Sequence, residues 1–203
     1  MYRDRHPLYQ GEIDGSKVTF VRLPVGAPGT VLQMEEMIAC GAHTFIGVGW
    51  AGSLQPEAHI GSFLIPAACV REEGTSLHYV NDEALLRPDA DLARLLEDAA
   101  KEEGVSVFSG MHWTIDAPYR ELVSEIEVNR ARGVIGVDME TSAMYALGIY
   151  RNVRVANLLV VSDEVWREWN PAFGSQELKD ANDMAIKIVI RSLRSLLNAS
   201  DSG

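Results

Sequence analysis

Three stretches of the sequence place carboxylates or glycines directly after a short apolar run. Carboxylates can orient hydroxyl groups and transfer protons, and glycines allow a ligand to approach the backbone closely. Any one such stretch is also typical of a helix N-cap, where Asp and Ser are common. Three of them at the ends of apolar runs favour one shared ligand site instead. The stretches are Gly49-Trp50-Ala51-Gly52-Ser53, Asp138-Met139-Glu140-Thr141 and Ser162-Asp163-Glu164.

The apolar runs before these stretches belong to an alternation of predicted strands and helices. Runs that are apolar on both faces are typical of a sheet covered by helices on both sides, and ligands of such sheets gather where strands end. The sequence therefore predicts an α/β fold with a mostly parallel or mixed sheet. The predicted strands are residues 18–23, 44–48, 62–70, 105–109, 134–137 and 155–162. The predicted helices are residues 30–40 (with Thr30 as N-cap and Gly41 as stop), 89–103, 118–132, 142–150 and 176–198.

Composition indicates one globular domain over residues 1–203, because no linker, repeat or composition shift divides the chain. The formal net charge of −11 argues against nucleic acid or an anionic membrane as a partner and leaves small molecules as the open ligand class. Cys40 and Cys69 lie in apolar stretches, so we predict buried free thiols and a cytoplasmic protein. The five histidines have no metal-ligand spacing, and no metal site is predicted.

Four ordered segments at characteristic spacing carry a resemblance to a known family. They are residues 24–29 (PVGAPG), 44–56 (TFIGVGWAGSLQP), 137–140 (VDME) and 161–163 (VSD). At these segments the chain resembles the nucleoside phosphorylase and nucleosidase superfamily, which includes purine nucleoside and uridine phosphorylases. The resemblance extends from about residue 12 to residue 191. It implies a three-layer phosphorylase-like fold in which helices flank a central mixed, largely parallel sheet.

The resemblance implies cleavage of an N-glycosidic bond, most directly the phosphorolysis of a purine nucleoside to free base and ribose 1-phosphate. The transition state of such a reaction carries positive charge on the sugar and negative charge on the departing base. By the resemblance, Glu140 accepts a hydrogen bond from a ribose hydroxyl and favours the cationic sugar, while Met139 packs against the sugar. Asp163 shares a proton with a purine ring nitrogen as the base leaves, and Ser162 orients Asp163.

Further residues of the substrate site follow from the resemblance. Ala51 and Gly52 form the floor under the base, where small residues allow close approach. Tyr119 or Trp113 is expected to stack on the base; alternatively, Asp116 caps the following helix and this loop faces solvent. The substrate site also includes Trp50, Val137 and Asp138.

The phosphate half of the site departs from the family pattern. No Lys or Arg lies between Arg22 and Arg71. Gly47 stands where the phosphorylases have an arginine, and Trp50 replaces a hydroxyl residue that helps to hold phosphate. The chain also starts after the first strand and loop of family members, where the nucleosidases have a water-activating glutamate. The remaining phosphate-binding candidates are Gly26, Gly29 and Thr30 at the start of a helix. A further candidate is Arg5, which by the resemblance corresponds to an arginine that some phosphorylases contribute to the site of a neighbouring subunit.

Three functions therefore stay open. The first is phosphorolysis, with inorganic phosphate as co-substrate and no other cofactor; the second is hydrolysis by water; the third is nucleoside binding with reduced catalysis. Leu122 and Ser124 hold the positions at which uridine-specific members recognise their base, which disfavours uracil. Trp166, Trp169 and Phe173 follow Asp163 and either cover the pocket or lie at a subunit interface. The resemblance implies a homodimer or hexamer as the assembly.

Overall fold

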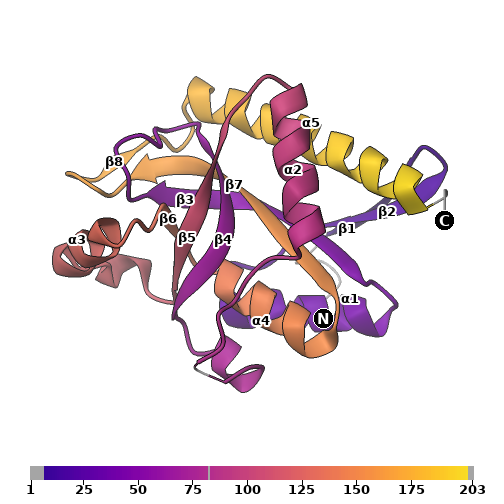
Figure 1. Cartoon of the computed structure of the whole chain (residues 1–203), viewed down its shortest axis with the longest axis horizontal. Coiled ribbons are helices and arrows are strands. Elements are labelled where there is room, and N and C mark those ends of the chain that lie inside the picture. Colours follow the sequence, from indigo (N-terminus) through magenta and orange to yellow (C-terminus); the bar gives the residue numbers. More distant parts are fainter. Residues whose placement is uncertain (1–6, 82, 201–203) are drawn as a thin grey trace.

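The structure, a computed structural model, describes residues 7–81 and 83–200 and contains a mixed sheet between helices (Figure 1). The strands are β1 (Leu8–Ile13), β2 (Ser16–Val21), β3 (Thr44–Ser53), β4 (Phe63–Glu72), β5 (Val107–Ile115), β6 (Gly136–Asp138), β7 (Arg154–Glu164) and β8 (Asn170–Pro171). The α-helices are α1 (Ala27–Ala39), α2 (Ala90–Glu102), α3 (Val123–Ala131), α4 (Thr141–Arg151) and α5 (Gln176–Ser200). Two 3₁₀ turns, η1 (Ser76–His78) and η2 (Pro118–Arg120), complete the described elements.

The central sheet has the strand order β3-β6-β5-β4-β7-β8. Because β3 also pairs with β7, the five strands β3, β6, β5, β4 and β7 close into a ring. The predicted three-layer arrangement did not include this closure. The pairings β3–β7, β4–β5 and β5–β6 are parallel, whereas β3–β6, β4–β7 and β7–β8 are antiparallel. The longest ladder is parallel and joins β3 to β7 from Thr44 opposite Arg154 to Ser53 opposite Glu164. The predicted mixed sheet of a phosphorylase-like fold is therefore confirmed.

Helices cover the sheet on two sides (Figure 1). On one side, α2 and α5 pack their leucines and alanines on alternate residues of β4 and β7, such as Ile65 and Leu158. On the other side, α1 and α4 bury a second apolar cluster around Met34 and Tyr145. The remaining residues of β7, such as Leu159, pack in a third cluster with residues of β3 and β4. Because both faces of the strands are buried, β7 is apolar nearly throughout.

Most predicted elements are present, with four corrections. The run at residues 18–23 overlaps β2, which pairs with β1 through an Asp14-Gly15 turn outside the central sheet. The N-cap of α1 is Gly26 and not Thr30, because the helix begins three residues earlier than predicted. The predicted helix at residues 118–132 is interrupted by extended backbone at Glu121 and Leu122. Cys69 is buried as predicted, but Cys40 at the end of α1 is exposed.

Within the described part of the chain, no helix combines the length and apolar character needed to cross a membrane.

Candidate functional site

Two of the predicted site residues meet at Gly52. This glycine pairs with Val137 of β6 on one side and with Asp163 of β7 on the other, next to a register shift after Ala51. A Cβ atom at position 52 would lie 3.2 Å from Val137 Cγ1 and 3.4 Å from Asp163 Oδ2. The position therefore favours glycine, since a side chain would press on the side chains of Val137 and Val165. The ring closure of the sheet thus brings three strand ends to one place.

Two side chains hold the Asp163 carboxylate from opposite ends. The buried Ser162 hydroxyl donates to Asp163 Oδ1 at 2.7 Å and also contacts the Ala51 carbonyl at 3.4 Å. The Trp169 indole N–H donates to Asp163 Oδ2 at 2.9 Å. The contact expected between Ser162 and Asp163 is therefore present, whereas the partner from the following loop was not anticipated. Both carboxylate oxygens accept a hydrogen bond in this arrangement.

Glu121 is a second carboxylate beside Asp163, and our sequence reasoning missed it. The side chain is half-buried and follows η2, where the chain is extended. Burial, together with the negative charge of Asp163, raises the pKa of Glu121 to about 7. In the sequence, Glu121 falls inside a stretch with helical periodicity, where a glutamate is ordinary. Only the interruption of that helix turns the residue toward the site.

Glu140 joins the predicted ribose segment to the glycine-containing loop before α1. Its Oε1 accepts a hydrogen bond from the Gly26 backbone N–H at 2.5 Å, across 114 residues of sequence. Burial raises the pKa of Glu140 to about 7, and the negative charge of Asp138 adds to the increase, although the Gly26 hydrogen bond opposes it. Met139 beside it is half-buried. Glu140 thus lies at the N-terminus of α1, where backbone N–H groups attract anions.

Asp138 has a structural position behind Glu140. Its carboxylate is buried and accepts hydrogen bonds from the hydroxyls of Thr114 and Thr141 and from the Thr141 N–H in the first turn of α4. Burial raises the pKa of Asp138, but nearby His112 and the threonine hydroxyls outweigh burial and hold it below its usual range. Through these hydrogen bonds, Asp138 connects β5 and β6 to the first turn of α4 and orients the start of that helix.

The predicted phosphate residues are largely engaged by the protein itself. The Gly26 N–H donates to Glu140, and the buried Thr30 donates its hydroxyl to the Pro24 carbonyl at 3.0 Å and its N–H to the Gly26 carbonyl at 3.1 Å. A Cβ atom at Gly29 would lie 2.8 Å from Pro24 Cβ, so Gly29 serves the close packing of the loop on the helix. Arg5 lies outside the described residues.

Asn157 of β7 fills the space beside Gly47. A Cβ atom at position 47 would lie 2.3 Å from Asn157 Oδ1 and 3.0 Å from Met144 Cε. The Asn157 amide donates to Thr141 Oγ1 at 2.9 Å, while Oδ1 has no partner among the described residues. No side chain can stand at position 47 without displacing Asn157. Further along β3, the indole N–H of Trp50 donates a hydrogen bond to Asn182 Oδ1 of α5 at 2.9 Å.

The two predicted aromatic residues lie in different elements: Tyr119 is in η2, whereas Trp113 is within β5, which runs to Ile115 and does not end at residue 109 as predicted. The Tyr119 side chain is fully exposed on η2. Trp113 is fully buried, and its indole N–H donates to Glu72 Oε2 at 2.8 Å. Asp116 accepts a hydrogen bond from the Gly74 N–H at 3.1 Å and does not cap α3, which begins seven residues later. Trp113 is thus buried away from a stacking position, and Asp116 does not form the expected helix cap. The stacking of Tyr119 on a base stays a prediction.

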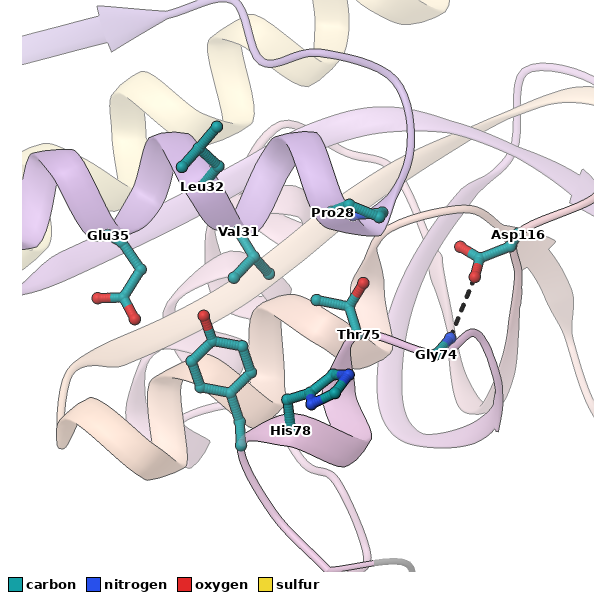
Figure 2. A pocket seen from close by; sticks show the side chains of 9 residues that line it. Pro28, Val31, Leu32, Glu35, Gly74, Thr75, His78 and Asp116 are labelled. Carbon is teal, nitrogen blue, oxygen red and sulfur yellow. Dashed lines mark hydrogen bonds between the residues drawn. The ribbon is translucent and has the colours of Figure 1, made fainter.

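A pocket of about 590 Å³ lies between α1 and the segment that carries η1. Figure 2 shows Val31 and Glu35 of α1 pointing toward the η1 segment across this space. The segment is anchored because buried Glu73 accepts hydrogen bonds from Ser142 Oγ at 2.8 Å and the Thr75 N–H at 2.7 Å. The residues lining the pocket are Pro28, Val31, Leu32, Glu35, Gly74, Thr75, His78, Tyr79 and Asp116.

Comparison with known proteins agrees with this arrangement of sheet and site. A family model described as the phosphorylase superfamily matches residues 2–197, and the chain therefore belongs to the phosphorylase superfamily. It is 30% identical over 202 residues to a uridine phosphorylase of Treponema pallidum, covering 93% of this chain and 77% of the relative. It is 27% identical over 203 residues to a uridine phosphorylase of Escherichia coli, covering 93% and 79%. A guanosine phosphorylase of Halorubrum lacusprofundi is 26% identical over 198 residues, covering 96% and 80%.

Proposed function

We propose that this protein is a pentosyltransferase that cleaves the N-glycosidic bond of a purine nucleoside by phosphorolysis, releasing the base and ribose 1-phosphate. The observation that carries the proposal is the convergence at Gly52 of Val137, which leads to Glu140, and of Asp163. The proposal assigns Glu140 to the sugar and Asp163 to the base. The names of the relatives, uridine and guanosine phosphorylases, support nucleoside phosphorolysis as the reaction type.

Asp163 and Glu121 support a purine as the base. A purine has a ring nitrogen, N7, that can take up a proton as the base departs, and a nearby carboxyl group is suited to supply or share it. The Ser162 hydroxyl holds the Asp163 carboxylate in a defined orientation. Glu121, with a pKa raised to about 7 by burial and by the charge of Asp163, adds a group that exchanges protons at neutral pH.

Glu140 supports the ribose half of the proposal. A carboxylate near the sugar accepts a hydroxyl hydrogen bond and stabilises positive charge that develops in the transition state. Because burial raises its pKa to about 7, Glu140 becomes fully ionised only above neutrality. A ribose hydroxyl would donate a hydrogen bond to the Glu140 carboxylate, either in place of the hydrogen bond from the Gly26 N–H or in addition to it.

A second candidate reaction is hydrolysis, and the surroundings of Gly47 favour it. Asn157 occupies the space of a side chain at this position, and Glu140 occupies the N-terminus of α1. In the part of the chain that the structure describes, no Lys or Arg forms a hydrogen bond or ion pair with Gly26, Glu140 or Asn157. A neutral or acidic site accepts water more readily than a phosphate dianion.

We further propose that the protein works in the cytoplasm as a homodimer or hexamer. The two free cysteines support the compartment. Exposed apolar side chains beside the pocket support the assembly: Leu32 lines the pocket, and Tyr150 contacts the pocket residue Tyr79 with a ring-centroid distance of 5.4 Å. Leu32 and Tyr150 are more than half exposed in the single chain.

The test is release of free base from inosine, adenosine, guanosine and uridine, each with and without inorganic phosphate. We expect phosphate-dependent release from a purine nucleoside. Asp163→Asn should lower kcat/KM by roughly 100-fold or more, as expected for loss of a general acid or base. Asp91→Asn, a matched change at an exposed aspartate of α2, should leave it unchanged.

Each outcome separates the candidates. Release that does not depend on phosphate would replace phosphorolysis with hydrolysis. Release from uridine alone would contradict the purine assignment. Absence of release with any nucleoside, while nucleoside binding is still detected, would contradict the enzymatic proposal and leave a binding protein.

A further inference from the structure

The loop after β7 places an indole ring on the carboxylate that is proposed to meet the base. Trp169 Nε1 donates to Asp163 Oδ2 at 2.9 Å. The Trp169 ring contacts Phe173 with a centroid distance of 6.4 Å, and Phe173 contacts Trp50 at 5.9 Å. Trp50 directly precedes the Ala51-Gly52 floor. Trp50, Phe173 and Trp169 thus form a row of aromatic rings that leads from the residue before Ala51 to the Asp163 carboxylate.

The backbone of this loop is hydrogen-bonded to β7, whereas the side chain of Trp169 is held by fewer contacts. Strand β8 pairs Asn170 with Glu164 and Pro171 with Asp163. The Ala172 N–H donates to the Ser162 carbonyl at 3.0 Å. The Trp169 side chain, by contrast, is 60% exposed and is held by one hydrogen bond and one ring contact. Rotation of this side chain costs far less than opening of the loop.

Indole and a departing purine share the features that matter here. Both are flat fused rings of five and six atoms, and both carry an N–H group on the five-membered ring. Asp163 Oδ2 can accept a hydrogen bond from either N–H, but two flat rings cannot occupy the same space against this oxygen at once. From this geometry we infer that Trp169 occupies the base subsite of the unliganded protein and that a purine must displace it to bind.

This inference rests on the proposed function, because it takes Asp163 as the base-side acid. It assigns Trp169 as a residue that lowers the affinity for the base without taking part in bond cleavage. Binding to a state that is only partly populated weakens the apparent affinity by the fraction of molecules in that state. Removing the competing N–H should therefore tighten purine binding.

The experiment compares the full chain with Trp169→Phe, which keeps an aromatic ring in contact with Phe173 but has no N–H donor. Isothermal titration calorimetry with adenine, hypoxanthine and guanine gives the Kd of each base. We expect Trp169→Phe to lower Kd by roughly tenfold, the effect of one hydrogen bond to a charged group. The nucleoside KM should fall as well, with kcat changed less than KM.

Trp166→Phe is the matched control in the same loop. Trp166 lies between Arg130 and Arg167 in cation–π contact, and its Nε1 has no hydrogen-bond partner among the described residues. This variant should bind the bases like the original protein. An equal or higher Kd in Trp169→Phe would overturn the inference, and a higher value would mark Trp169 as a stacking partner of the base. The absence of base binding in both proteins would also overturn it.

The two proposals fail in different ways. Tighter base binding by Trp169→Phe without turnover of any nucleoside preserves the base subsite and contradicts the proposed reaction. Turnover by the original protein, together with unchanged base binding in Trp169→Phe, preserves the reaction and contradicts the role of Trp169.

Discussion

At the scale of single residues, the site contains two carboxyl groups whose ionised forms are disfavoured by the folded structure. Glu140 and Glu121 both have a pKa raised to about 7, in each case mainly by burial. A carboxyl group whose pKa is higher in the folded than in the unfolded chain contributes stability at low pH, and this contribution is lost as the pH rises through the folded-state pKa. Ionisation of Glu140 therefore weakens the fold progressively as the pH rises from the usual carboxyl range to about 7, and the ionised form is the one that suits a ribose hydroxyl.

We expect Glu140→Gln to raise the melting temperature at pH 8 and to change it less at pH 6. Glutamine keeps an oxygen that can accept from the Gly26 N–H but avoids the cost of a buried charge. The same substitution should lower kcat/KM for a purine nucleoside at least tenfold. Thermal unfolding at both pH values and steady-state kinetics measure the two effects.

The control for this substitution is Glu127→Gln at an exposed position of α3, which should change neither quantity. A melting temperature that falls equally at both pH values in Glu140→Gln would contradict the assigned burial cost.

At the scale of elements, the β3–β7 ladder decides what position 47 can hold. Gly47 lies opposite Asn157 in this ladder, and the Asn157 side chain folds over the glycine. Asn157 also donates to Thr141 in the first turn of α4, so the ladder is linked to the helix that follows Glu140. The same packing that excludes a side chain at position 47 thus helps to hold the ribose segment.

We expect Gly47→Ala to destabilise the protein by about 1–3 kcal/mol, the usual cost of overpacking a filled interior. The methyl group would meet Asn157 Oδ1 at 2.3 Å. Urea unfolding measures the change. The cost should be smaller when Asn157→Ala is introduced first, because residues in contact show non-additive effects.

Gly49→Ala provides a matched control two residues further along β3. Its methyl group would meet Leu159 Cδ2 at 3.5 Å, an ordinary contact, and alanine is better than glycine in a strand interior. Equal destabilisation by both substitutions would contradict the specific conflict with Asn157.

At the scale of the whole molecule, the pocket and its exposed apolar rim suggest that the single chain is not the working unit. The pocket lies between α1 and the η1 segment (Figure 2). Leu32 from α1 and Tyr150 at the end of α4 project apolar surface beside it. Exposed apolar patches of this kind are typical of subunit interfaces.

We expect sedimentation equilibrium to give a dimer or a hexamer, and Leu32→Asp to shift the protein toward smaller species. A charge placed in an apolar interface loses its hydration without gaining a partner. Ile186→Asp, at an exposed position of α5 in the opposite helical layer, is the control. A monomer at all concentrations, or equal dissociation by both substitutions, would contradict this assignment of the interface.

The sequence by itself determined the class of fold and the order of the site segments. Strands that are apolar on both faces must be buried on both sides, so their approximate positions could be read from hydrophobicity alone. The ends of β3, β6 and β7 marked Gly52, Glu140 and Asp163 because such strand ends are where ligands gather. The missed strand β1 is short and largely exposed, which leaves little apolar signal, although Asp14-Gly15 is a hairpin signature.

Only the tertiary structure decided which side chains face one another. Trp169 and Glu121 reach Asp163 because β8 folds back on β7 and because the chain is extended after η2. Asn157 fills the space at Gly47 because two strands more than 100 residues apart pair in one register. Contacts of this kind depend on the register and closure of the sheet, which arise from the packing of all strands together and leave no periodic pattern in a single segment.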